Sequence, residues 1–240
     1  MVLLIDFDSI IYTSVYKVVG IRAMREAIEK HGKQAAKQWL LEEVYNEGIN
    51  RCENELLKIQ NYIDDQILDD ITGVELFITT DKNSFRKKLS PSYKIKRKRN
   101  KYVWVIRDHY QMNNAKCSDT LEADDLIATR ARELGKDNCI VISIDKDLKQ
   151  IGGFYWSYFK VKSKDSNGDL ILNEFGSYER EYKQKLIQYI SDDERDSFFW
   201  SQMLTGDSGD GIKGLHRVGI KTAEKILAKT SVNWFAVARE

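Results

Sequence analysis

The sequence predicts an α/β protein with a mainly parallel central sheet flanked by helices. Residues 2–5 and 139–144 are largely apolar runs, as in strands buried on both faces of a sheet, and residues 74–79 show a further strand pattern. Helical patterns separate these strands, and this alternation is typical of a parallel sheet. The hydrophobic content of 42% in 240 residues is enough for a substantial core.

Helices are expected in three places between the strands. Apolar residues at three-to-four spacing predict helical structure within residues 21–71, and residues 102–112 have a similar pattern. Residues 122–134 begin with acids in the first turn, where the helix dipole favours negative charge, and Gly135 is placed to end that helix.

The rest of the chain predicts a hairpin followed by helices. We expect residues 154–161 and 169–172 to pair around the turn at Asn167-Gly168. After that the chain is expected to be helical, interrupted by a glycine-spaced loop. We therefore divide the chain into an α/β core, residues 1–185, and a helical part, residues 186–240.

Charge is balanced overall but concentrated locally. The net charge is +1, so a preference for nucleic acid has to come from segregated charge. Residues 82–101 contain ten basic residues and no acid. A charged run is usually a solvated surface, but this one lies between two acidic motifs, which favours phosphate binding.

The cysteines and the hydropathy of the sequence indicate in which cellular compartment the protein is expected. The three cysteines share no CxxC spacing, which argues against a disulfide framework or a zinc site and favours a reducing cytoplasm. No apolar run reaches about 18 residues, so we expect no membrane-spanning helix.

Carboxylates recur where expected strands end. Asp6, Asp81 and Asp145 each follow a strand, and ligands of open α/β sheets bind beyond these carboxyl ends, so the three should converge. A single aspartate after a strand is usually a cap, but three, together with acids at a helix start, are harder to explain in that way. The candidate metal ligands are Asp6, Asp81, Glu122, Asp124, Asp125, Asp145, Asp147, Asp207 and Asp210.

Crowded carboxylates need compensating cations, because like charges raise each other's pKa. Oxygen ligands select Mg²⁺ or Mn²⁺, and no histidine is placed to change that preference. Two such ions about 4 Å apart can activate a water and stabilise a leaving oxygen. Among the acids at strand ends and helix starts, Asp8 and Asp125 are those we least expect to bind metal.

Five motifs follow one another in a recognisable order. They are Leu-Ile-Asp-Phe-Asp-Ser at 4–9, Asp81 with the basic segment through Arg97, Leu-Glu-Ala-Asp-Asp at 121–125, Ser-Ile-Asp-Lys-Asp-Leu at 143–148, and the glycine-spaced segment 206–223. Together they resemble the 5′ nuclease family, which includes flap endonucleases, phage 5′-to-3′ exonucleases and the 5′ nuclease domain of bacterial DNA polymerase I. The resemblance implies a PIN-like 5′ nuclease core and a C-terminal helix–three-turn–helix subdomain.

The resemblance also implies roles for particular residues. One metal would lie near Asp6, Asp81, Glu122 and Asp124, and a second near Asp124, Asp145, Asp147 and Asp210, with Asp207 alongside. The catalytic cations would be Lys94 and Arg86, and the DNA-binding residues would be Tyr93, Arg97, Gly219, Lys221 and Thr222. Backbone carbonyls of Leu204, Thr205, Lys213, Leu215 and Val218 would bind K⁺.

By the same resemblance, the partner is DNA with 5′ ends or flaps, with RNA/DNA hybrids as a further substrate. The protein is expected to act as a monomer in the cytoplasm of a bacterium or a phage-infected host. Three positions in the glycine-spaced segment depart from the family pattern: Arg217 stands where glycine is usual, His216 where proline is common, and Gly211 where asparagine is usual. The interval from Lys94 to Glu122 is short for the family's helical arch.

Two other functions remain open from the sequence. Residues 5–9, Ile-Asp-Phe-Asp-Ser, resemble the nucleophile motif of HAD-type phosphatases, but that function leaves residues 122–125 and 206–223 unexplained. A non-catalytic protein that binds DNA junctions would tolerate lost ligands, yet every expected carboxylate is present.

Overall fold

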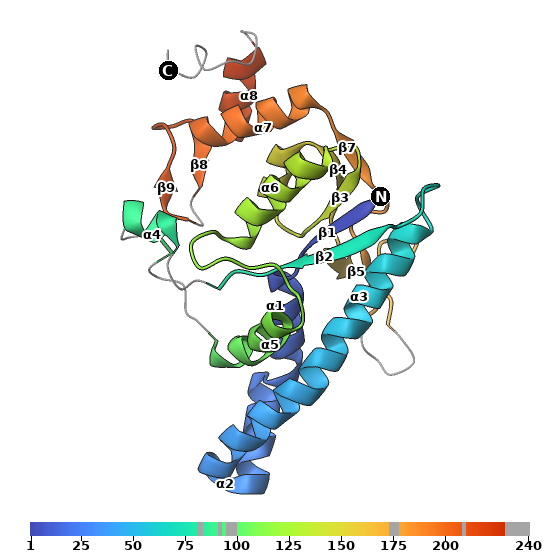
Figure 1. Cartoon of the computed structure of the whole chain (residues 1–240), viewed down its shortest axis with the longest axis vertical. Helices are drawn as coiled ribbons and strands as arrows, with labels where there is room; N and C mark the ends of the chain where they lie inside the picture. Colours follow the sequence, from blue (N-terminus) through green and yellow to red (C-terminus); the bar gives the residue numbers. More distant parts are fainter. Residues whose placement is uncertain (81–83, 91–92, 95–99, 173–177, 208–209, 229–240) are drawn as a thin grey trace.

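A five-stranded sheet forms the centre of the computed structural model (Figure 1). The structure describes residues 1–80, 84–90, 93–94, 100–172, 178–207 and 210–228, and for residues 21–23 it describes the backbone alone. The strand order is β2-β1-β3-β4-β7; the first four strands are parallel, and β7 is antiparallel to β4. These strands are β1 (Val2–Asp6), β2 (Gly73–Phe77), β3 (Cys139–Ile142), β4 (Gly153–Trp156) and β7 (Gln188–Ile190). The predicted α/β class with a mainly parallel sheet is confirmed.

Helices precede and follow the strands as the sequence pattern indicates. They are α1 (Asp8–Val18), α2 (Ile21–Glu43), α3 (Ile49–Asp64), α4 (Phe85–Leu89), α5 (Lys101–Met112), α6 (Ala123–Leu134), α7 (Asp192–Thr205) and α8 (Ile220–Ala228). A π-helical turn, η1 (Val44–Gly48), joins α2 to α3, and a 3₁₀ segment, η2 (Lys146–Ile151), follows β3. No helix within these described ranges is long and apolar enough to cross a membrane.

The predicted helical region 21–71 ends earlier than its apolar pattern suggests. The last helical residue of α3 is Asp64, and residues 65–72 connect it to β2 without helix. Aspartates gather at this end, where the helix dipole disfavours negative charge, so the apolar spacing alone does not extend the helix.

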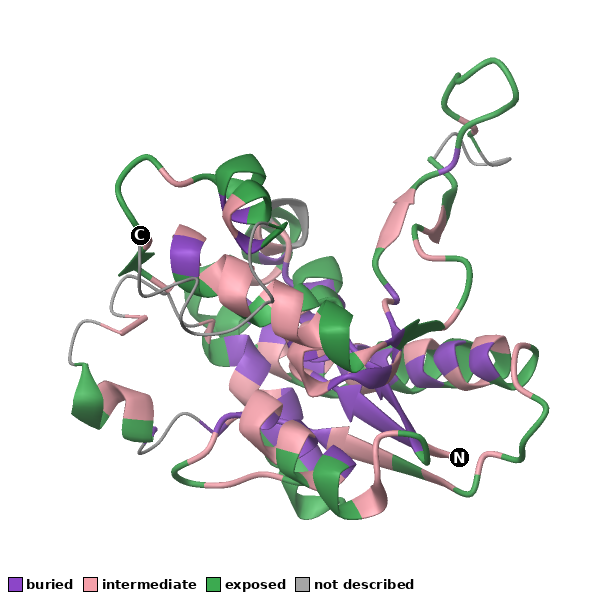
Figure 2. Ribbon diagram, turned by 90° about the horizontal axis from the view of Figure 1, so that it is seen from above, coloured by how far each residue is buried: buried purple, intermediate pink, exposed green. Residues whose placement is uncertain are grey.

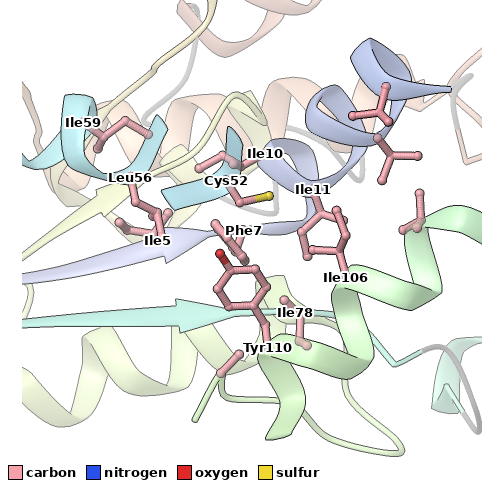
Figure 3. Packing of buried hydrophobic residues seen from close by; sticks show 14 of the residues in the cluster. Ile5, Phe7, Ile10, Ile11, Cys52, Leu56, Ile59, Ile78, Ile106 and Tyr110 are labelled. Carbon is pink, nitrogen blue, oxygen red and sulfur yellow. The ribbon is translucent and has the colours of Figure 1, made fainter. Parts of the chain in front are cut away.

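Alternate side chains of β1 point to two separate cores. Leu3 and Ile5 belong to a large cluster with α1, α2, η1, α3 and α5, whereas Leu4 packs with α6 on the opposite face. Figure 3 shows the first cluster, in which Ile5 and Phe7 lie among side chains of α1, α3 and α5. The central strands β1 and β3 are therefore buried on both faces, as Figure 2 shows for the centre of the molecule.

The predicted hairpin around Asn167-Gly168 forms, but residues 169–171 pair with 163–165, where Lys164 lies opposite Leu170, and not with 154–161. Residues 153–156 form β4 of the central sheet, and β5 (Lys160–Lys162) pairs instead with β6 (Arg180–Tyr182). Tyr155 and Trp156 are 2% and 0% exposed, and burying such large side chains in the central sheet outweighs a local hairpin. The turn itself forms, because Gly168 N donates to Asp165 O at 3.1 Å.

The C-terminal helices make a small core of their own. Leu204 of α7 is buried with Ala223 and Leu227 of α8, and the intervening chain forms a two-stranded ladder of β8 (Gly206–Asp207) and β9 (Ile212–Lys213). Strand β7 lies beyond residue 185 and still belongs to the central sheet, so the expected division at 185/186 falls just before the last strand of that sheet.

Candidate carboxylate-lined active site

A cleft of about 1170 Å³ collects most of the predicted site. Its lining includes Glu122, Asp124, Asp125, Asp145, Asp147, Asp207 and Asp210, together with Arg86, Tyr93 and Lys94. A smaller cavity of about 400 Å³ shares Lys94, Glu122, Asp124 and Asp145 with the cleft and adds Asp6 and Asp8. The structure thus brings together eight of the nine predicted metal ligands; the ninth, Asp81, lies outside the described residues, as does Arg97.

Asp6 is the last residue of β1 and is 6% exposed. Its carboxylate accepts a hydrogen bond from Ser143 Oγ at 2.7 Å, and its backbone oxygen accepts one from Tyr158 Oη at 3.0 Å. Burial, followed by the negative charges of Asp8 and Asp124, raises the pKa of Asp6 to about 8. The carboxyl group is therefore largely protonated at pH 7 unless a cation binds to it.

The start of α6 presents three acids. Glu122 is the N-cap and forms a capping box with Asp125, whose Oδ2 accepts from Glu122 N at 3.0 Å. Burial, and then the charge of Asp145, raises the pKa of Asp124 to about 6. The capping chemistry that begins this helix also fixes these acids at the cleft.

Two cations and a tyrosine lie against these acids. Lys94 Nζ donates to Glu122 Oε2 at 2.9 Å, and Tyr93 Oη donates to the same oxygen at 3.1 Å. Arg86 binds Asp125 through two hydrogen bonds of 2.5 and 2.7 Å. Burial opposes the charge of Lys94, but its hydrogen bonds to Glu122 and Tyr93 raise its pKa above the ordinary value.

The acids after β3 are arranged by a short 3₁₀ turn. Asp145 caps η2 by accepting from Asp147 N at 2.9 Å, and Tyr155 Oη donates to the backbone oxygens of Ser143 and Asp145 at 2.8 and 3.1 Å. Burial is the main cause that raises the pKa of Asp147. This turn directs Asp145 and Asp147 into the same cleft.

Asp207 and Asp210 reach the cleft from the C-terminal part. Asp207 lies in β8, and Asp210 N donates to its Oδ1 at 3.4 Å. Helix α7 is attached to η2 by a hydrogen bond between Gln202 and Gln150. The site therefore draws on segments about 200 residues apart in the sequence.

Comparisons with known proteins show what the chain is similar to in sequence and in fold. No family model matches the chain. It is 32% identical over 155 residues to DNA polymerase I of Rhizobium leguminosarum, a match that covers 60% of this chain and 14% of the polymerase. It is 29% identical over 167 residues to flap endonuclease Xni of Shewanella baltica, covering 65% of this chain and 57% of Xni. The chain therefore spans less than two thirds of the length of either curated relative.

Solved structures extend the likeness to the whole fold. The bacteriophage T5 D15 protein co-crystallised with metal ions superposes with a TM-score of 0.60 at 13% identity, covering 100% of this chain and 78% of that one. The D15 flap endonuclease in a pseudo-enzyme-product complex with DNA and metal ions gives 0.55 at 15% identity with the same coverage. The chain is thus similar in sequence to a flap endonuclease and to part of a DNA polymerase I, and in fold to the T5 D15 protein. At these identities the solved structures establish the fold alone.

The described residues of the glycine-spaced segment, 206–207 and 210–219, make a tight approach between α7 and α8. Gly206 approaches Gly214 so closely that a Cβ on Gly206 would lie 2.2 Å from Gly214 N. Arg217, where the family pattern has glycine, has φ +61°, a left-handed backbone that glycine adopts without steric cost. The positive φ at position 217 therefore explains why glycine is usual there, and arginine has to adopt a backbone conformation that is unfavourable for it.

Several atoms predicted to bind K⁺ or DNA are hydrogen-bonded within this loop. Leu204 O accepts from Leu215 N at 2.8 Å, and Leu215 O accepts from Val218 N at 3.2 Å. Thr222 N donates to Gly219 O at 2.9 Å at the start of α8. A cation at these carbonyls would use their second lone pairs.

The donor set of the cleft fits a hard cation. Glu122 Oε1 and Asp147 Oδ1 are buried and accept no hydrogen bond from the part of the chain that the structure describes. Buried carboxylate oxygens without donors are costly, and a divalent cation would satisfy them. Within the same described ranges, no three acidic, histidine or cysteine side chains are close enough to enclose one ion.

Sequence reasoning missed several residues that line the smaller cavity. They are Ser9, Tyr12, Thr79, Arg107, Ile144 and Lys146. Tyr12 follows Asp8 by four residues on α1, so helical spacing could have placed it on the same face as that acid. Arg107 comes from α5, about 100 residues away, and no local pattern relates it to Asp6.

Proposed function

We propose that the protein is a structure-selective 5′ nuclease that hydrolyses phosphodiester bonds at or near DNA 5′ ends and flaps. The observation that supports this most directly is a pair of adjoining cavities that share Lys94, Glu122, Asp124 and Asp145. The acid at the end of β1 lines the smaller one, and Arg86, Asp207 and Asp210 line the larger one. Its relatives are a flap endonuclease and a DNA polymerase I.

Divalent metal is part of this proposal, and the T5 D15 protein was co-crystallised with metal ions. Two Mg²⁺ or Mn²⁺ ions would be held, one by Asp6, Asp81, Glu122 and Asp124 and the other by Asp124, Asp145, Asp147 and Asp210, with Asp207 alongside. Such ions supply an activated water and stabilise the leaving oxygen.

The chain's own cations would act on the scissile phosphate. Lys94 and Arg86 now neutralise Glu122 and Asp125, at side-chain exposures of 16% and 30%. When metal takes over that neutralisation, the two cations can bind phosphate oxygens and stabilise the charge that develops during hydrolysis. Tyr93, beside them, would stack on the terminal base, and Arg97 would bind the backbone.

The C-terminal part, residues 186–240, would hold the duplex while residues 1–185 cut it. The start of α8, at Gly219, Lys221 and Thr222, is suited to phosphate because helix N-termini attract anions. K⁺ at the carbonyls of the preceding loop would strengthen this contact. Backbone contacts carry no sequence information, so selection would follow strand structure, and RNA/DNA hybrids would be substrates too. The described parts of this site all come from one chain, so the protein would act as a monomer.

A 5′-labelled flap incubated with Mg²⁺ or with EDTA tests the proposal. We expect cleavage with Mg²⁺ only, and losses of about 100-fold or more in Asp145→Asn and Asp210→Asn. Binding without metal-dependent cleavage would instead support the non-catalytic junction-binding function. Equal cleavage by both variants would refute the site assignment. Hydrolysis of p-nitrophenyl phosphate that needs Asp6 but not Asp210 would favour the HAD-type phosphatase.

A further inference from the structure

Arg107 is a buried cation that the proposed chemistry does not use. It lies on α5 and is 6% exposed. Its Nε and Nη2 donate to Asp8 Oδ1 at 3.0 and 2.7 Å, and its guanidinium lies 5.6 and 5.1 Å from the ring centroids of Tyr12 and Trp104. A buried ion pair is weak evidence for stability, because apolar residues of similar size often stabilise as much. Its placement therefore calls for another explanation.

The second oxygen of Asp8 continues the connection toward the cleft. Thr79 N, just after β2, donates to Asp8 Oδ2 at 3.2 Å. Thr79 Oγ1 in turn accepts from Ala123 N, in the first turn of α6, at 3.0 Å. Arg107, Asp8 and Thr79 thus connect α5, α1, the end of β2 and the start of α6 in one continuous chain.

Each contact of this chain adjoins a proposed metal ligand. Asp8 is two residues from Asp6, and Ala123 lies between Glu122 and Asp124. A shift of Asp8 would thus be transmitted both to Asp6 at the end of β1 and to the acids at the start of α6. Second-shell contacts of this kind orient metal ligands and commonly change metal affinity or activity when removed.

We propose that Arg107 is a positioning residue which, through Asp8 and Thr79, sets the separation between Asp6 and the acids at the start of α6. The inference rests on the proposed function. Arg107 differs from Lys94 and Arg86 because its side chain is only 8% exposed and is flanked by two rings, so it stays with Asp8. Asp8 accordingly serves as the acceptor for Arg107 and Thr79.

The test measures metal binding directly as well as catalysis. Mn²⁺ affinity is determined by calorimetry without DNA, and kcat and KM are determined on a 5′ flap. For Arg107→Gln we expect a 10- to 100-fold loss in Mn²⁺ affinity and in kcat, with KM for DNA changed less than about twofold. Arg107→Lys, which keeps the charge but not the two-donor geometry, should recover part of the loss.

Arg130→Gln is the matched control. Arg130 makes a comparable pair with Glu75, with contacts of 2.9 to 3.1 Å that join α6 to β2 away from the cleft. We expect it to lower the melting temperature without changing Mn²⁺ affinity or kcat. If Arg107→Gln behaves in the same way, Arg107 is merely structural and the proposal is overturned.

Other outcomes are equally decisive. If Arg107→Gln does not fold, Asp8→Asn is tested instead. Asparagine has the size of aspartate, but its single acceptor oxygen cannot replace both Oδ1, which binds Arg107, and Oδ2, which binds Thr79 N. Wild-type Mn²⁺ affinity and kcat in Asp8→Asn would also overturn the inference. A wild-type protein that neither binds Mn²⁺ nor cuts DNA would refute the proposed function itself, whereas active wild type with unaffected variants refutes only the role of Arg107.

Discussion

Replacing Asp6 by asparagine should stabilise the metal-free protein. Burial, and then the charges of Asp8 and Asp124, place the pKa of Asp6 at about 8, against 3.8 for an ordinary aspartate. The folded state therefore binds a proton that the unfolded state has lost between these two values. The stability that this proton provides is fully present below pH 3.8 and is lost as the pH rises to about 8.

The structure sets the size of the effect. The difference from 3.8 to about 8 is about 4 pKa units, and at about 1.4 kcal/mol each this is roughly 6 kcal/mol at pH 8. Weakening the hydrogen bond from Ser143 costs about 1 kcal/mol of this gain. Asparagine should therefore raise the free energy of unfolding by about 5 kcal/mol at pH 8, and the melting temperature by about 10 °C or more.

Thermal unfolding in EDTA from pH 5 to pH 9 measures this difference. The advantage of Asp6→Asn should grow by about 1.4 kcal/mol per pH unit and level off above pH 8. Mn²⁺ should stabilise the wild type far more than the variant, since the ion replaces the proton. If Asp6→Asn is no more stable than the wild type at pH 8 in EDTA, the carboxylates do not destabilise one another as the geometry indicates.

Three further predictions concern the cleft and the glycine-spaced loop. Lys94→Met should lower kcat by about 10²- to 10³-fold in single-turnover flap cleavage while CD confirms folding, and full activity would exclude a role for Lys94 at the phosphate. Gly206→Ala should destabilise the protein by about 2 kcal/mol or more in urea unfolding, because the new Cβ would meet the backbone of Gly214. The control Gly211→Ala should destabilise it less, because a Cβ there has no atom within 4 Å. Equal effects of the two substitutions would contradict the close packing at Gly206. Arg217→Gly should raise the melting temperature by about 2 °C, because about 1 kcal/mol of strain in the left-handed backbone is relieved. A melting temperature below that of the wild type would show that the arginine side chain stabilises the loop.

The fold follows from local features that the sequence displays openly. The acids after β1 and β3 lie at the carboxyl ends of parallel strands, where ligands of such sheets bind. The acids that begin α6 are favoured there by the helix dipole. The same residues therefore mark both the secondary structure and the site. The pattern therefore predicts Asp6 and Asp145 at one edge, and their convergence with Glu122. The pairing partners of residues 154–161 were wrong, because burial of Tyr155 and Trp156 places this segment in the central sheet and leaves residues 163–165 to pair across the turn.

What the sequence does not display is contact between distant segments. The pairs Arg107–Asp8 and Arg86–Asp125 join residues 99 and 39 positions apart, and no periodicity encodes them. The left-handed backbone at Arg217 is similarly hidden, because arginine gives no sign of positive φ. The packed structure is needed to see that Arg107 and Arg86 are neutralised by Asp8 and Asp125, and that Glu122 Oε1 and Asp147 Oδ1 accept no hydrogen bond from the described residues.

The position of β1 between two parallel neighbours has a consequence for how the protein tolerates change. Asp6 ends a strand hydrogen-bonded on both sides, so its backbone amide should exchange with solvent only when the whole domain opens. Among the described residues, the chain at 210–219 is held by a small core in which Leu204, Ala223 and Leu227 are buried, and we expect it to open at a lower free energy than the central sheet. Substitutions near β1 should therefore alter the stability of the whole domain, whereas substitutions at residues 215–219 should first alter how readily this loop opens.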